Sequence, residues 1–137
     1  FSNDTSALKA VSRGHCGVTI VNTYYLARLL DDPQYDNLRL FWANQKNRGV
    51  HVNISGAGIV NTSNNKENAI KLLEYFSSKK AQEFYASAVK EYPVVEGSEI
   101  NEALKSWGTF VEDNINVSKL GSLQKEAVFL AQEAGYK

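Results

Sequence analysis

The sequence contains one cysteine, no methionine, two prolines and two histidines among its 137 residues. Cys16 alone cannot form an internal disulfide or supply a thiolate metal cluster. The net formal charge is zero, because 15 basic residues balance 15 acidic ones without long blocks of one sign. This balance argues against a nucleic-acid surface. No apolar run approaches the roughly 20 residues that span a bilayer.

The remaining composition is that of a soluble globular chain, with 43% hydrophobic and 22% charged residues. A chain of this length is the size of one ordinary domain. Its first residues, FSNDTS, lack the charged and apolar segments of an export signal. The expectation is therefore that a signal was removed or that this is an internal piece of a longer chain.

Helical periodicity, together with capping residues, predicts a series of helices. The second of them begins after Asn22 or Thr23 and runs to Leu30, and the others cover residues 5–13, 65–77, 79–90 and 120–134. Three stretches rich in β-branched and aromatic residues predict strands between these helices, at residues 17–21, 38–43 and 49–55. Interleaved strands and helices favour an α/β fold with a largely parallel sheet.

Two adjacent tyrosines, Tyr24 and Tyr25, follow the first predicted strand and lie in the first turn of the next helix. In open α/β sheets, ligands bind at the edge where strands end and helices begin. A phenolate oxygen is a hard donor that suits ferric iron better than softer metals. An arbitrary pair of tyrosines is nevertheless more often a packing or surface feature, so both interpretations stay open at this point.

No motif in the sequence predicts catalysis. His15 and Cys16 have no second histidine or cysteine nearby, and the glycines of SGAGI (55–59) lack the spacing and lysine of a phosphate loop. The sequence contains no recognisable Ser-His-Asp set, Cys-His set or pair of catalytic carboxylates. We therefore predict no catalytic residues and a protein that is not an enzyme.

Five landmarks occur in order through the whole chain: VNTYYLARLL (21–30), RGVHVNISGAGIV (48–60), NKENAIKLLEYFSSKKAQEFYA (65–86), EYPVV (91–95) and EAVFLAQEAGYK (126–137). Together they resemble the C-terminal part of the ferric-iron substrate-binding proteins of bacterial ABC importers. The resemblance implies a periplasmic-binding-protein-like α/β fold of type II, present here in part. Residues 1–49 and 98–137 would then belong to the C-terminal lobe, and residues 50–97 to the N-terminal lobe.

The resemblance also implies roles for three residues. Tyr24 and Tyr25 match the family's tyrosine dyad, whose phenolates ligate ferric iron in an interlobe cleft rather than packing into a core. Asn22 matches a residue that in some members helps to hold a synergistic anion, such as carbonate, beside the metal. The family's remaining iron ligands come from its N-terminal half and have no counterpart in this sequence.

The implied function is the capture of ferric iron and its delivery to an ABC permease in the inner membrane. The implied location is the periplasm, or the outer face of the membrane for a tethered protein from a Gram-positive source. Two alternatives are kept: a protein of the same fold that binds another small solute or anion, and a small α/β enzyme. Open strand edges in a partial fold also predict a homo-oligomer or a swapped dimer.

Overall fold

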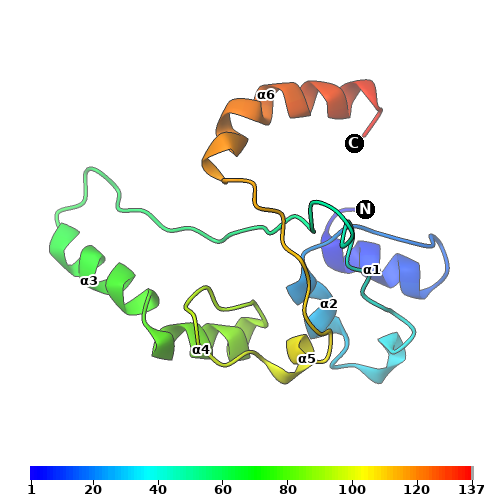
Figure 1. Cartoon of the computed structure of the whole chain (residues 1–137), viewed down its shortest axis with the longest axis horizontal. Helices are drawn as coiled ribbons and strands as arrows, with labels where there is room; N and C mark the ends of the chain where they lie inside the picture. The colour runs from blue at the N-terminus through cyan, green and yellow to red at the C-terminus, as the bar shows by residue number, and fades with distance from the viewer. Residues whose placement is uncertain (137) are drawn as a thin grey trace. The chain divides into compact units, whose positions relative to one another are not determined.

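The computed structural model describes residues 1–136. Its helical elements follow one another along the chain, and Figure 1 labels the α-helices among them. They are α1 (Asp4–Ser12), α2 (Thr23–Leu29), the 3-10 turn η1 (Pro33–Tyr35), α3 (Lys66–Phe76), α4 (Lys79–Val89), α5 (Glu102–Lys105) and α6 (Ser118–Glu133). None of the helices formed by residues 1–136 combines the length and the apolar character that a membrane crossing requires.

The helix predictions are confirmed to within about two residues at most ends. Local signals account for this agreement, because the ends of a helix leave backbone groups that nearby side chains can satisfy. The Oδ1 atom of Asn3 accepts a hydrogen bond from the Ser6 backbone at 2.9 Å, and Ser78 Oγ accepts one from Ala81 at 3.3 Å. Gly135, at φ +70°, follows α6 in the left-handed conformation that glycine adopts without cost.

The strand predictions are wrong for this chain. Between residues 1 and 136 the backbone pairing of extended segments is limited to one parallel bridge, from Val50 to Glu112. Val18 and Ile20, expected to be buried in a sheet, are 79% and 95% exposed. β-branched residues favour an extended backbone, but a strand also needs a neighbour that completes its hydrogen bonds. The described residues supply no such neighbour for 17–21.

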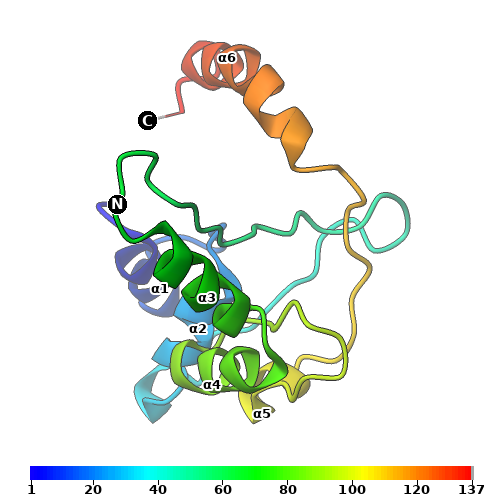
Figure 2. The ribbon, with the colours of Figure 1, turned by 90° about the vertical axis from the view of Figure 1, so that its left-hand side faces the viewer.

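The described chain divides into two compact units, and the first comprises residues 1–41 and 53–109. Its core is a cluster of four buried side chains from α1, α2 and the segment that follows α2: Leu8, Leu26, Tyr35 and Leu38. Helix α1 packs against α2, and α3 leads through a tight turn into α4, against which it packs (Figure 2). This core is what holds the helix that carries the two tyrosines.

The second unit comprises residues 42–52 and 110–137, of which the last is not described. The rings of Trp42 and Phe110 stack with their centroids 4.2 Å apart. The Gln45 side chain bonds both backbone groups of Val111, donating to its carbonyl at 3.0 Å and accepting from its N–H at 2.6 Å. Two segments far apart in sequence are thereby held in register.

Gly49 provides the closest backbone approach in this second unit. Its φ is +88°, and a Cβ atom there would lie 2.5 Å from the carbonyl carbon and oxygen of Glu112. We expect Gly49→Ala to destabilise the protein by about 2 kcal/mol or more, because the backbone of Glu112 cannot yield as a side chain would. Thermal unfolding measures this, with Gly56→Ala as the control, since a Cβ at Gly56 meets nothing within 4 Å. Equal melting temperatures for the two variants would contradict the expectation.

Candidate metal site

Tyr24 and Tyr25 both lie in the first turn of α2, as the sequence predicted, and both are half-buried. Their ring centroids are 4.4 Å apart with the planes tilted by 37°. The expectation that neither ring belongs to a core is wrong for Tyr25, whose ring packs against the core cluster of Leu8 and its neighbours. Tyr25 therefore makes two kinds of contact: its ring packs against the core, and its hydroxyl forms a hydrogen bond with Tyr24.

The Tyr25 phenol influences the pKa of Tyr24. Hydrogen bonding with Tyr25 is the largest cause that raises the pKa of Tyr24 above its usual 10.0, followed by burial of the group. The negative charges of Tyr25, Glu91 and Asp4 raise the Tyr24 pKa further. In the metal-free protein, Tyr24 is therefore a neutral phenol at physiological pH. A highly charged cation would have to displace its proton before the oxygen could serve as a phenolate ligand.

Arg28 lies one helical turn beyond Tyr24, and its guanidinium carbon is 4.9 Å from the centroid of the Tyr24 ring. This is within the range of a cation–π interaction. The sequence interpretation did not select Arg28. The spacing of four residues between Tyr24 and Arg28 is the signal that could have found it, since residues four apart share one face of a helix.

Asn22 occupies the N-cap position of α2, but its side chain makes no capping hydrogen bond to the described residues of that helix. Its Oδ1 instead accepts a hydrogen bond from Asn53 Nδ2 at 3.2 Å. Two residues further on, Ser55 Oγ lies 3.4 Å from the carboxylate of Glu91, whose charge acts on Tyr24. Residues 53–55 thus connect Asn22 with Glu91 beside the tyrosine pair, a link that no local sequence signal indicates.

The described residues do not contain a complete set of conventional metal ligands. Among residues 1–136, no three His, Cys, Asp or Glu side chains are grouped so that they could hold a metal ion. The two tyrosines therefore represent a partial ligand set. A hard trivalent cation bound there would need further oxygen or nitrogen donors.

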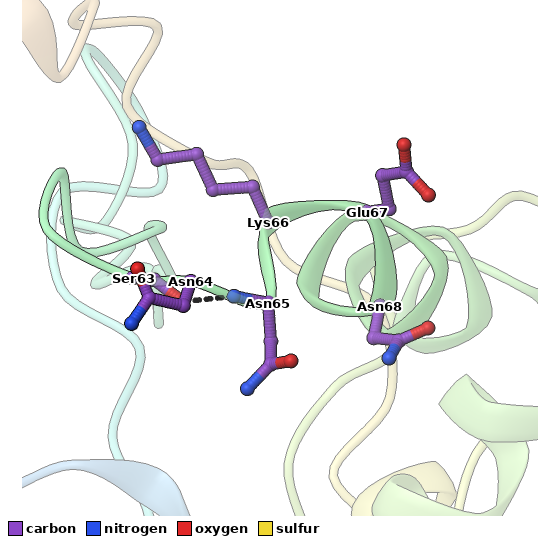
Figure 3. Close-up of a pocket in the computed structure, with 6 residues that line it drawn as sticks. All are labelled: Ser63, Asn64, Asn65, Lys66, Glu67 and Asn68. Atoms are coloured by element: carbon purple, nitrogen blue, oxygen red, sulfur yellow. Dashed lines mark hydrogen bonds between the residues drawn. The ribbon is translucent and has the colours of Figure 1, made fainter.

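An open hollow of about 430 Å³ lies elsewhere in the first unit, at the start of α3 (Figure 3). It is lined by residues 63–68, and the Asn65 backbone N–H donates to Ser63 Oγ at 3.1 Å. Neither the tyrosines nor Asn22 lines this hollow. Most of its side chains are exposed polar groups, so we treat it as a surface feature rather than as a second candidate site.

Comparison with known proteins shows what the chain as a whole is similar to. No protein-family model matches this chain. It is similar to "Iron uptake protein A1" of Synechocystis sp., with 42% identity over 98% of this chain and 39% of the relative. It is similar in structure to a Trichodesmium protein solved "in complex with iron and citrate ligands", with 43% identity, a TM-score of 0.91 and coverage of 100% of this chain and 45% of the other. A "ferric binding protein from Campylobacter jejuni" matches at 33% identity and a TM-score of 0.91, again over 100% and 45%.

These matches cover nearly all of this chain but less than half of each relative. The chain spans 39% and 41% of the length of the first two curated relatives it matches. A site whose ligands are distributed over a longer polypeptide would therefore be represented here only in part.

Proposed function

We propose that this chain contributes the tyrosine ligands of a ferric-iron site. The premise is that the chain belongs to the family of ferric-iron-binding proteins. Its fold is part of the type II periplasmic-binding-protein fold, to which the structurally similar proteins belong. The individual strands predicted from sequence are absent from the described chain, whereas the predicted fold class is confirmed by this similarity. Like its relatives, the protein is a binding protein for transport and not an enzyme.

The observation that carries the iron proposal is the pairing of Tyr24 and Tyr25 at the start of α2. Their ring centroids lie 4.4 Å apart, so two hard oxygen donors come from neighbouring residues of one helical turn. Such a pair can present two phenolates to the same cation, and ferric iron is the hard, trivalent cation that phenolates favour. The relatives' names also favour iron over another small solute or anion, and over the small α/β enzyme considered as an alternative.

Further ligands complete the proposed site. A solved relative holds citrate together with iron, so a synergistic anion, carbonate or a carboxylate of this kind, fits beside the dyad. Asn22, at the start of the same helix, is the residue we propose to help hold the anion, because its amide can donate to an anion oxygen. The contact with Asn53 at 3.2 Å orients that amide by occupying its oxygen rather than its nitrogen.

The relatives include one protein that is named as periplasmic, which supports a periplasmic location for this protein. We propose that it delivers ferric iron to an ABC permease in the inner membrane. In a Gram-positive source, the equivalent protein would be exported and tethered to the outer face of the membrane. Residues 1–49 and 98–137 are proposed to form one lobe, and residues 50–97 part of the other. These ranges do not coincide with the two compact units, and the support for them is the family resemblance.

Association between copies is the proposed consequence of the segments that lack strand partners. Val18 and Ile20 are strongly exposed, and unpaired extended backbone invites pairing with another chain. We expect the 137-residue chain to form a homo-oligomer or a swapped dimer, with a mass that rises with concentration in light scattering. A compact monomer at every concentration would contradict this expectation.

A direct test of the iron proposal uses the colour of the ferric complex. We expect the full-length protein with one equivalent of ferric iron to show a visible charge-transfer band, because phenolates donate electron density to an oxidising cation. Absorption spectroscopy with parallel iron analysis measures this. Stoichiometric bound iron without such a band would show that the tyrosines are not ligands, and no bound iron at all would count against the function itself.

A further inference from the structure

Two cationic side chains join the C-terminal ends of α2 and α4. Arg28, in the last turn of α2, donates from Nε and Nη2 to the Val89 carbonyl at 3.2 and 3.1 Å. Lys90, directly after α4, donates from Nζ to the Ala27 carbonyl at 3.0 Å. Lys90 Nζ also pairs with the carboxylate of Asp31. A cationic side chain at the end of each helix therefore donates a hydrogen bond to a backbone carbonyl of the other helix.

Both carbonyls belong to the group that a helix cannot satisfy by itself. The last four carbonyls of an α-helix have no partner within it, and Ala27 and Val89 lie in the last turns of α2 and α4. The same ends carry the negative pole of the helix dipole, which favours a nearby positive charge. The arrangement is a reciprocal cap, in which each helix end is satisfied by a side chain from the other helix.

Lys90 is unusually constrained for a surface lysine. Its backbone is left-handed, with φ +58°, and its side chain is only 14% exposed, although its partner Asp31 is 69% exposed. Lysine residues are mostly exposed and are almost never fully buried unless their charge is paired. The cost of burying the Lys90 ammonium is offset by its two acceptors, the Ala27 carbonyl and the Asp31 carboxylate. The left-handed backbone at Lys90 leads the chain into Glu91.

Helix α2 depends on contacts of this kind. It has seven residues, and a helix that short is not stable without tertiary support. Its N-terminal turn carries Tyr24 and Tyr25, and Arg28 reaches both the Tyr24 ring and Val89. A shift of the α2 end relative to α4 would therefore be transmitted to the tyrosine rings within one helical turn.

We propose that Lys90 is a positioning residue for the tyrosine pair, acting through the reciprocal cap that it forms with Arg28. The proposal rests on the ferric-iron function proposed above, and it adds a residue that lies 63 positions from Ala27 along the chain. Lys90 does not touch the metal in this role. It holds α2 at the angle at which both phenolates can reach one cation.

The test is made in the full-length protein with Lys90→Gly, which removes the ammonium while glycine keeps the left-handed backbone without strain. Asp31→Asn removes the ion pair and leaves the bond to Ala27 in place. Lys80→Met, at an exposed position on α4, is the matched control. We expect Lys90→Gly to shift the ferric charge-transfer maximum and to speed iron loss to excess citrate by about tenfold, as the loss of a charged hydrogen bond would. Asp31→Asn should have a smaller effect in the same direction.

The outcomes separate a positioning role from a merely structural one. A lower melting temperature for Lys90→Gly, with an unchanged band and an unchanged rate of iron loss, would overturn the proposal. So would equal behaviour of Lys90→Gly and Lys80→Met. If the unsubstituted protein binds no ferric iron, the iron function fails, and if it binds iron without the band, the tyrosines are not its ligands. In either case the reciprocal cap is judged by amide hydrogen exchange in the metal-free protein. Faster exchange across α2 in Lys90→Gly than in Lys80→Met would support it, and equal exchange would refute it.

Discussion

Replacing either Tyr24 or Tyr25 with phenylalanine is expected to weaken ferric-iron binding by about 100-fold or more, equivalent to about 2.8 kcal/mol. Each substitution removes one phenolate oxygen and one negative charge from the cation, and water is the replacement ligand. The fold should remain nearly intact, because phenylalanine keeps the aromatic ring. This matters most for Tyr25, whose ring packs against the core cluster.

Competition titrations against citrate measure the change in affinity, and thermal unfolding measures the change in stability. Tyr75→Phe is the matched control, since Tyr75 is 52% exposed on α3 and lies outside the proposed site. If Tyr24→Phe or Tyr25→Phe unfolded the protein while the folded fraction still bound iron at full strength, the two side chains would be packing residues. An unchanged affinity in both variants would exclude them as ligands.

Acidification is expected to weaken ferric binding by at least about tenfold per pH unit, because the Tyr24 phenol must ionise when iron binds. The sign follows from the protonation of the metal-free site. The pKa of Tyr24 is raised above 10.0, chiefly by its hydrogen bond with Tyr25 and then by burial. The phenol is therefore neutral near pH 7 and must release its proton when iron binds. Because protons compete with iron, lowering the pH favours the metal-free form.

Affinity measured between pH 5 and 7 against a chelator of known protonation behaviour gives the number of protons released. In Tyr24→Phe the Tyr24 proton no longer has to be displaced, so the dependence of affinity on pH should become weaker by about tenfold per pH unit. An affinity that does not vary with pH after correction for the chelator would mean that no phenol is deprotonated on binding. The dyad would then contact the solute as neutral hydrogen-bonding groups.

The helices could be predicted from sequence because their signals are local. Asn3 and Ser78 provide side-chain caps within three residues of the backbone groups they satisfy, and Gly135 marks the end of α6. The strands could not be predicted in the same way. Residues 17–21 have the composition of a buried strand, yet a strand is completed by hydrogen bonds to a neighbour that local composition cannot supply.

The same distinction between local and long-range signals applies to the candidate site. The sequence by itself determined that Tyr24 and Tyr25 begin a helix, that Asn22 precedes them, and that this part of the chain resembles iron-binding proteins. Only the tertiary structure decided that Tyr25 packs on the core, that its hydrogen bond and then the charge of Glu91 raise the pKa of Tyr24, and that Lys90 caps α2. The physical reason is distance along the chain: periodicity and caps act within a few residues, whereas Arg28 and Val89 are 61 residues apart and meet only when the chain is folded.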